Sequence, residues 1–510
     1  MSDSAIAGQA VPAVEDRVPM RTKIFFGLGS AAETIGLAVI GGFAQFYYNQ
    51  ILGMSATLAG LAISAGLILD AFSDPVMGSL SDRTRSRLGR RHPYMLLSIV
   101  PLGLSIWGVY HPPEHWQELW LFFWFALLVI SVRTFLTLFA VPRLALGGEL
   151  SSHYTERTSV MSYNNLFAWI GGAGTAWVAL SYFFHATPEH PNGMLNPAAY
   201  PAMATAAALV MVVFMLLCSW FTLDHARAWM ARDDERRRLR AQNTGVSASA
   251  DSVVERANSK FSAGAFFSDM KGAFTNRNYV VLLLAFFFIS CMLGMRGGMN
   301  VYVQNFFWEF KPEQTRMYVL GSLVGYVTAF RFTRWLHERF DKRNVIVAGA
   351  AALAIFPAAP IIARLLGWLP DNDWEYLLPV LVAWSILGAW GGAAANISVM
   401  SALAEVADEN ELRFGARQEG VIYATRSFFA KVDDAIGHVI AGIAIDLIAF
   451  PVRAIPGKVD PDVIWKLGFV DAVVSLIPGL IAVVFYSMYR MDRTKHAQLQ
   501  ADLERMRASG

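Results

Sequence analysis

The sequence has 510 residues, of which 55% are hydrophobic and only 16% are charged. Soluble domains have roughly 25% charged residues, so the composition disfavours a soluble enzyme, a nucleic-acid-binding protein and a disordered scaffold. The formal net charge of +2, from 42 basic and 40 acidic residues, does not indicate a polyanionic partner. The mean hydropathy of +0.40 points instead to a chain that spans a membrane.

Long apolar runs, each near the ~20 residues that a membrane-spanning helix needs, predict twelve spans. These runs are continuous rather than alternating, so a β-barrel is disfavoured. We predict an all-α integral membrane protein with twelve transmembrane helices in two six-helix bundles. The spans are expected near 24–48, 54–81, 93–111, 117–145, 160–184, 201–223, 279–307, 314–336, 344–366, 375–403, 421–448 and 467–489.

The charged segment 225–278 separates the two predicted bundles. We expect an N-terminal tail at 1–22, bundles at 23–224 and 279–489, a linker at 225–278 and a C-terminal tail at 490–510.

The distribution of basic residues predicts the orientation of the chain. The loop after the second span is rich in arginine, whereas the loop 185–200 has neither Lys nor Arg. Because basic loops stay on the cytoplasmic side, both termini and the linker are expected in the cytoplasm, with the chain in the cell (inner) membrane. The basic loop 449–466 is an exception to this pattern.

Two aspartates within the second predicted span form the first polar cluster. Asp70 and Asp74 are four residues apart, so their carboxylates share one helix face. Together with the hydroxyl of Ser73 they offer the oxygen ligands that a small hard cation prefers. Polar groups inside a membrane are costly and indicate function, so we predict a cation site here. The alternative is a structural pairing with arginines on neighbouring helices.

A second cluster lies in the eleventh predicted span, at Lys431 and Asp434. Their i, i+3 spacing allows a direct pair that is neutral and purely structural. The functional alternative has Lys431 contacting a substrate or the carboxylates of the other bundle, and the sequence leaves both open.

Other polar residues also fall within the predicted spans. Arg133, Arg143 and Arg296 lie near span ends or polar stretches, so we expect their side chains to reach the interface. His438 is expected to be a packing residue. The remaining candidates are Glu33, Thr34, Thr137, Asn164 and Asn165.

The sequence has few features that would indicate an enzyme. Cys218 and Cys291 lie in separate apolar runs, and no phosphate-binding loop or nucleophile motif is present. The pattern from His111 to His115 matches a zinc motif, but its two prolines prevent the helical geometry that the motif requires. We therefore expect no enzymatic activity, no resident metal beyond Na⁺, and no cofactor beyond a coupling H⁺ or Na⁺.

Three motifs resemble the glycoside–pentoside–hexuronide:cation symporters of the major facilitator superfamily, typified by melibiose permease. The first runs from Asp70 to Pro93, the second covers 141–158, and the third runs from Ala404 through Gly420 to Lys431. The resemblance extends over roughly residues 20–490 in the family's order. It implies two six-helix bundles and cation-coupled transport of an organic solute.

The resemblance also implies roles for individual residues. The family's cation site corresponds to Asp70, Ser73, Asp74 and Thr137, and Lys431 corresponds to the lysine that links the second half to that site. Expected substrate or coupling residues are Lys431, Glu33, Thr34, Asn165 and Asp434. The family's sugar-binding acids, tryptophan and arginine are replaced here by Thr34, Ala140, Leu144 and Asn165.

Three functions follow as hypotheses. The first is cation-coupled symport of a sugar, glycoside or uronide by a monomer that contacts membrane lipid and no nucleic acid. The second is transport of an amphiphile such as a lysolipid, which the apolar Leu144 favours. The third is a membrane sensor that transports nothing, which the buried charges disfavour.

A cytoplasmic latch is also expected after the second span. Asp82 is predicted to pair with Arg83, Arg87 or Arg90, and with a helix of the other half. Such pairs would hold one state of an alternating-access equilibrium.

Overall fold

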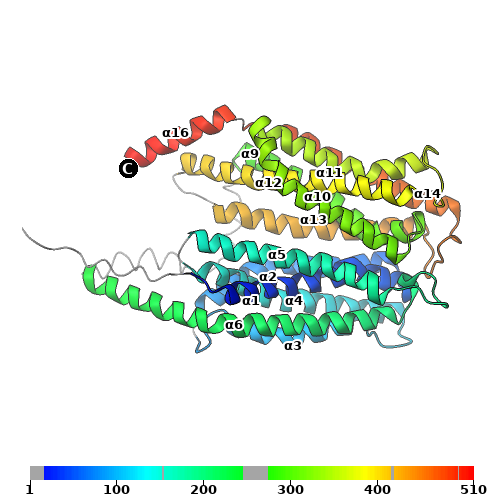
Figure 1. Ribbon diagram of the computed structural model, residues 1–510, viewed down its shortest axis with the longest axis horizontal. Coiled ribbons are helices and arrows are strands. Elements are labelled where there is room, and N and C mark those ends of the chain that lie inside the picture. Colours follow the sequence, from blue (N-terminus) through cyan, green and yellow to red (C-terminus); the bar gives the residue numbers. More distant parts are fainter. Residues whose placement is uncertain are drawn as a thin grey trace, which may run out of the picture.

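The molecule is a bundle of long helices that run nearly parallel to one another (Figure 1). It is seen in a computed structural model that describes residues 17–84, 86–151, 154–244, 274–414, 419–491 and 493–509. Within these residues all regular secondary structure is helical. The predicted tail up to residue 16 and the linker residues 245–273 lie outside the described part of the chain.

The helices before the linker form the first group. They are α1 (Met20–Val39), extended by the π-helical turns Ile40–Ala44 and Tyr47–Ile51, α2 (Ala56–Arg83), α3 (His92–Val109), α4 (Glu118–Glu149), α5 (Tyr154–Val178), extended by the π-helical turn Ala179–Phe183, and α6 (Ala199–Thr244), which a short 3₁₀ turn at Gly193–Leu195 precedes. Helix α6 continues to Thr244, so residues 225–244 of the predicted linker belong to this helix.

The helices after the linker form the second group. They are α9 (Arg277–Tyr302), extended by the π-helical turn Val303–Phe307, α10 (Pro312–Arg339), α11 (Lys342–Leu365), α12 (Leu377–Phe414), α13 (Glu419–Leu447), α14 (Pro461–Phe469), the π-helical turn Val470–Val474, α15 (Leu476–Ser487) and α16 (Arg493–Ser509). Helix α16 occupies most of the predicted C-terminal tail and packs on α12.

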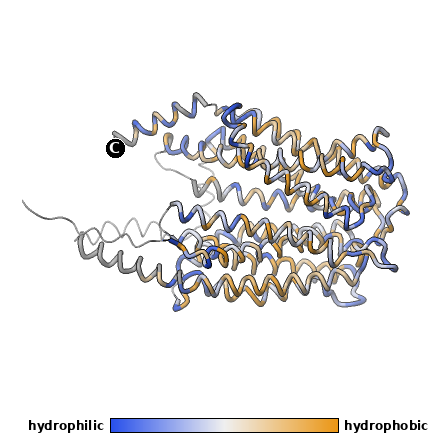
Figure 2. Tube along the Cα trace, viewed as in Figure 1, coloured by the Kyte–Doolittle hydropathy of each residue, from blue (hydrophilic) through white to orange (hydrophobic). Residues whose placement is uncertain are grey.

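Ten helical segments of the described chain are long and apolar enough to cross a membrane. Hydrophobic residues predominate along the bundle, whereas hydrophilic residues gather in loops and in α16 (Figure 2). The other two predicted spans correspond to α10 and α13, which are 28 and 29 residues long. Arginines lower the hydropathy of α10, and Lys431, Asp433 and Asp434 lie near the middle of α13. The same charges that suggest a function for α13 therefore make it too polar to be recognised as a membrane span from hydropathy alone.

Helices α2 and α13 bring the two groups together. A Cβ atom on Gly60 of α2 would lie 2.6 Å from the carbonyl oxygen of His438 on α13, so only glycine permits this approach. Ser64 of α2 also donates a hydrogen bond of 2.6 Å to the carbonyl of Ala435. Small residues are the usual means of close helix packing in lipid. This contact fixes the faces that α2 and α13 present to each other.

The two groups also meet at the end of the bundle opposite α16, which we call the closed end. Asn49 accepts a hydrogen bond of 2.8 Å from the hydroxyl of Tyr302. Phe46 of the first group packs against Tyr302 and Phe306 of the second group, with ring centroids 5.2 and 6.1 Å apart. Aromatic and polar contacts from both groups therefore join the helices at this end.

Candidate functional site

The aspartates of α2 lie where α2, α4 and α13 meet. Asp70 is 7% exposed, and Pro75 follows Asp74 within the helix. Proline has no N–H to donate to the carbonyl four residues earlier, so the backbone hydrogen bonding of α2 is interrupted beside the two acids. Because Asp70 and Asp74 are one helical turn apart, both carboxylates lie on the same face of α2, and this face is directed toward the second group.

Thr137 of α4 joins the two carboxylates. Its hydroxyl oxygen lies 2.5 Å from Oδ1 of Asp70 and 3.0 Å from Oδ1 of Asp74. Ser73 lies beside them, with its hydroxyl 3.4 Å from that of Thr137. The four residues expected to form a cation site therefore gather in one place, and their oxygen atoms suit a small hard cation.

Lys431 of α13 contacts the same carboxylates. Its ammonium nitrogen lies 2.9 Å from Oδ2 of Asp70 and also forms an ion pair with Asp74. The sequence left open whether Lys431 pairs with Asp434 or with the acids of the other half. The structure selects the acids of the other half, so one side chain of the second group neutralises a cluster of the first.

Arg133 of α4 is the second cation beside Asp70. One terminal nitrogen of its guanidinium lies 3.7 Å from Oδ2 of Asp70, and its side chain is only 12% exposed. The expectation that Arg133 reaches the interface is wrong, because Asp70 holds it inside the bundle. Two aspartates thus face two basic side chains, so the four charges that are in direct contact balance one another.

A second buried ion pair joins α1, α4 and α5. Arg143 is 2% exposed and lies 2.8 Å from Glu33. It also donates a hydrogen bond of 2.7 Å to Asn164 and lies over the ring of Phe26. The prediction that Arg143 reaches the interface is therefore also wrong. Asn164, rather than the more exposed Asn165, supplies the amide at this position.

A cavity of about 390 Å³ links the two clusters. Six of the predicted residues line it, together with Arg133, Arg143 and Asn164, whereas Ser73, Asn165 and Asp434 do not. Apolar Leu136, Ala140 and Leu144 complete its wall. The six predicted residues are Glu33, Thr34, Asp70, Asp74, Thr137 and Lys431. The hydroxyl of Thr34 donates within its own helix, to the carbonyls of Ser30 and Ala31.

The predicted latch residues lie around the turn after α2. Asp82 forms an ion pair with Arg91, rather than with Arg87 or Arg90 as expected. Arg91 also lies 2.8 Å from Glu149 of α4, and Arg90 lies 2.9 Å from the same carboxylate. Arg83 is the last residue of α2 and Arg87 lies in the exposed turn. These ion pairs connect helices of the first group.

The remaining predicted residues are explained by packing. His438 is buried, with Nδ1 3.2 Å from the side-chain oxygen of Gln45, as expected for a packing residue. The expectation that Arg296 reaches the interface is wrong, because Arg296 lines a cavity inside the second group. Within the described residues, no cluster of His, Cys, Asp and Glu has the arrangement of a metal site.

A multi-pass helical protein with balanced charges between two helix groups has the architecture of a membrane transporter. A family model described as "MFS/sugar transport protein" matches residues 25–493. The chain therefore belongs to this family, and its predicted relation to the glycoside–cation symporters is confirmed.

Curated relatives match almost the whole chain. An uncharacterized symporter of Synechocystis is 24% identical, with 95% of this chain and 97% of the relative covered. The isoprimeverose transporter of Lactiplantibacillus pentosus is 20% identical, with 97% and 93% covered. The sodium-dependent lysophosphatidylcholine symporter 1 of Mus musculus is 21% identical, with 99% and 92% covered.

Solved structures share the fold. The xylose transporter of Escherichia coli, in a partially occluded inward-open conformation, superposes with a TM-score of 0.57 at 14% identity. The match covers 92% of this chain and 99% of that transporter. The chain thus has the all-helical major facilitator fold.

Proposed function

We propose that this protein is a secondary active transporter that couples symport of an organic solute to H⁺ or Na⁺. The observation that carries the proposal is the contact of Lys431 with both Asp70 and Asp74. The two acids lie on the first group and the lysine on the second, so their interaction depends on how the groups sit relative to each other. Curated relatives named as symporters support the same activity.

Coupling follows from competition for the two carboxylates. Two carboxylates one turn apart repel each other unless a cation or a proton neutralises them. In the structure Lys431 supplies this charge, which lets the carrier without ion and solute change its conformation. Binding of H⁺ or Na⁺ displaces Lys431, because the cluster is already balanced by two basic side chains. The displaced ammonium of Lys431 is then free to contact the solute.

The solute is proposed to be a sugar, glycoside or uronide. This choice rests on the family and on relatives such as the isoprimeverose transporter. A lysolipid is the second candidate, because Leu136, Ala140 and Leu144 make one wall of the cavity apolar. The name of the mouse relative also specifies a lysophosphatidylcholine.

The remaining features of the proposal follow from this function. The protein is not an enzyme and needs no cofactor besides the coupling ion. It acts as a monomer in the cell (inner) membrane, surrounded by lipid, and binds no nucleic acid. Both termini and the linker face the cytoplasm, so the closed end faces the opposite side. Alternating access then requires the contacts of the closed end to break.

Solute uptake into proteoliposomes under an imposed pH or Na⁺ gradient tests the proposal. The probes are a panel of labelled pentosides, hexosides and hexuronides, with labelled lysophosphatidylcholine as the lipid arm. We expect the parent protein to accumulate at least one of them only when a gradient is present. Asp74→Asn and Asp70→Asn, which each imitate a protonated carboxyl, should lose uphill accumulation but keep exchange of internal for external solute.

A matched control is Asp462→Asn, because Asp462 is exposed and its ion pair is with Lys466, one turn later in the same helix. This variant should accumulate solute like the parent. Full accumulation by both the Asp70→Asn and Asp74→Asn variants would show that these acids have a structural role only.

A further inference from the structure

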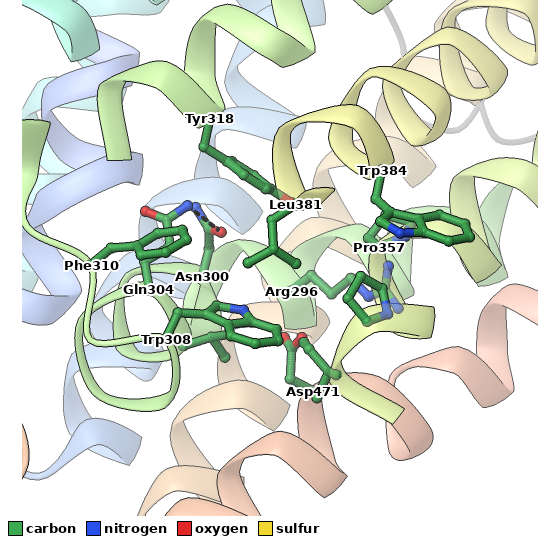
Figure 3. Close-up of a pocket in the computed structure, with 13 residues that line it drawn as sticks. Arg296, Asn300, Gln304, Trp308, Phe310, Tyr318, Pro357, Leu381, Trp384 and Asp471 are labelled. Carbon is green, nitrogen blue, oxygen red and sulfur yellow. Dashed lines mark hydrogen bonds between the residues drawn. The ribbon is translucent and has the colours of Figure 1, made fainter. Parts of the chain in front are cut away.

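A second polar cavity lies inside the second group, away from the acid cluster. It has a volume of about 70 Å³ and is lined by residues of α9 to α12 and of the turns after α9 and α14 (Figure 3). Two charged side chains, Arg296 and Asp471, face it from different helices. We call it the Arg296–Asp471 pocket.

Asp471 is a buried acid that interacts electrostatically with Arg296, but its carboxylate has no hydrogen-bond partner among the described residues. It is only 7% exposed, and no described residue donates a hydrogen bond to its carboxylate or forms an ion pair with it. Burial of an unpaired polar group is costly. The carboxylate therefore offers two unused acceptor oxygens to a group that enters the pocket.

Arg296 contributes an unused donor. Its Nε donates to the hydroxyl of Ser475 at 3.0 Å, and one terminal nitrogen donates to the carbonyl of Ala354 at 3.2 Å. The other terminal nitrogen is buried and has no hydrogen-bond partner among the residues that the structure describes. These two bonds fix the plane of the guanidinium, so the third nitrogen is held in a defined position.

The rest of the pocket is aromatic and amide in character. Trp308, Trp384 and Tyr318 form much of its wall (Figure 3). The side-chain amide of Gln304 donates to the side-chain oxygen of Asn300 at 3.1 Å, and no described residue accepts from the amide N–H groups of Asn300. Flat apolar rings, together with donors and acceptors side by side, match a molecule with C–H faces and hydroxyl edges.

The pocket adjoins a larger cavity between the two groups. Asn300 and Gln304 line both cavities, and the larger one has a volume of about 490 Å³. Its wall includes Gly41 and Gly42, where an added Cβ would meet nothing within 4 Å. Thr34 and Leu37 in turn line both this cavity and the one around Asp70. Shared wall residues thus connect the acid cluster to the Arg296–Asp471 pocket.

We propose that the Arg296–Asp471 pocket is a recognition subsite for the hydroxyl edge of a neutral sugar, whose ring lies in the adjoining cavity. A hydroxyl both donates and accepts, so one or two hydroxyls satisfy the carboxylate of Asp471 and the free N–H of Arg296 together. A pocket of this size accommodates such groups but not a whole ring. The opposite charges of the two residues favour a neutral solute, because an ionised uronate would face the carboxylate of Asp471.

This inference rests on the proposed function and narrows its solute class. It places sugar recognition in the second group, whereas cation binding lies mainly in the first. The apolar residues Ala140 and Leu144 in the first group then agree with sugar binding, because the groups that bind the sugar hydroxyls lie in the second group.

The test is equilibrium binding of tritiated sugars to the purified full-length protein in detergent. The probes are D-xylose, D-galactose and methyl β-D-glucoside as neutral ligands, D-glucuronate as the charged ligand, and lysophosphatidylcholine as the lipid. We expect at least one neutral sugar to bind, and D-glucuronate to bind more weakly. Asp471→Asn and Asn300→Ala should each weaken the binding of that sugar roughly tenfold or more, as the loss of a polar contact to a hydroxyl does.

Asp462→Asn is the matched control, since it changes an exposed acid on the neighbouring helix turn. Asn300→Ala removes no buried charge, so its sugar affinity tests the subsite even if the Asp471→Asn variant does not fold. Unchanged affinity in both Asp471→Asn and Asn300→Ala, or failure of every neutral sugar to bind the parent, would overturn the subsite. If the parent binds sugar in this way but shows no gradient-driven uptake, symport is wrong and the subsite stands.

Discussion

The ammonium of Lys431 lies 2.9 Å from a carboxylate oxygen of Asp70, although 361 residues separate them in the chain. The contact spans the boundary between the two helix groups. A coupling ion and Lys431 therefore compete for the same acids, and the outcome of that competition depends on the relative position of the groups. Such a differential contact is what an alternating-access equilibrium requires.

The first prediction concerns the balance of this cluster. In the double variant Asp70→Asn/Asp74→Asn, Lys431 loses both its acidic partners in a site where its side chain is only 21% exposed. Removing one side of a buried ion pair typically costs about 3 kcal/mol of stability, so we expect a lower midpoint of thermal unfolding in detergent. Adding Lys431→Met should restore most of it. Equal midpoints for the parent and the double variant would show that the pair contributes nothing.

The second prediction concerns the closed end. Asp446 of α13 accepts hydrogen bonds from the hydroxyl of Ser55 at 2.5 Å and from the backbone N–H groups of Ala56 and Thr57 at 3.1 and 2.8 Å. The end of one helix of the second group thus caps the start of α2. Asp446→Ala removes this cap, and we expect it to open the cavity toward that side.

A single reporter measures the opening. Cys218 and Cys291 are the only cysteines of the chain and are buried, so Gly42→Cys provides one accessible thiol in the cavity. Its rate of modification by an impermeant thiol reagent, added on the side of the closed end, should rise roughly fivefold or more, because loss of a helix cap shifts an equilibrium by ~1 kcal/mol or more. Asp371→Ala, which removes an exposed acid at the same end, should leave the rate unchanged. No increase with Asp446→Ala would exclude this cap from the gate.

The third prediction compares how much Arg91 and Asp82 each contribute to the stability of the protein. Arg91 is 6% exposed, and it contacts Glu149 of α4 and the hydroxyl of Ser81 as well as Asp82. We expect Arg91→Gln to destabilise the protein by about 2–4 kcal/mol, because it leaves the half-buried Glu149 with less compensation.

Asp82→Asn should change the stability by less than about 1 kcal/mol, since Asp82 is 60% exposed. Thermal unfolding of the two variants checks both values, and a larger loss with Asp82→Asn would reverse the ranking. That Asp82 also contacts the other half in another state stays a prediction, which the Gly42→Cys reporter tests. A modification rate equal to that of Gly42→Cys alone would show that Asp82 is not a latch.

The sequence predicts those parts of the site that depend on local spacing. Asp70 and Asp74 share a face because they are one helical turn apart, and the apolar runs place the helices that carry them. The partner of Lys431 depends on how two distant helices pack, so the sequence leaves two alternatives. Arg133 and Arg143 were misplaced because their partners, Asp70 and Glu33, lie on other helices.

Asp471 is absent from the predicted site residues, although its position in the sequence is informative. It lies near the start of the apolar run 467–489, where an acid is expensive and therefore informative. Its proximity to Arg296 depends on how the helix turns after α9 and α14 fold beside α11, which no local pattern specifies.

The last prediction concerns Asp433, whose side chain is completely buried in α13. Within the described part of the chain, neither of its carboxylate oxygens has a hydrogen-bond partner. An unpaired buried polar group costs about 1–3 kcal/mol, and an apolar residue of similar size avoids this cost. We therefore expect Asp433→Leu to raise the midpoint of thermal unfolding. Asp433→Asn is the matched control and should not raise it, because the amide is left equally unpaired. A lower midpoint for Asp433→Leu would mean that the carboxyl has a stabilising partner, and retained stability with loss of gradient-driven uptake would assign Asp433 to coupling.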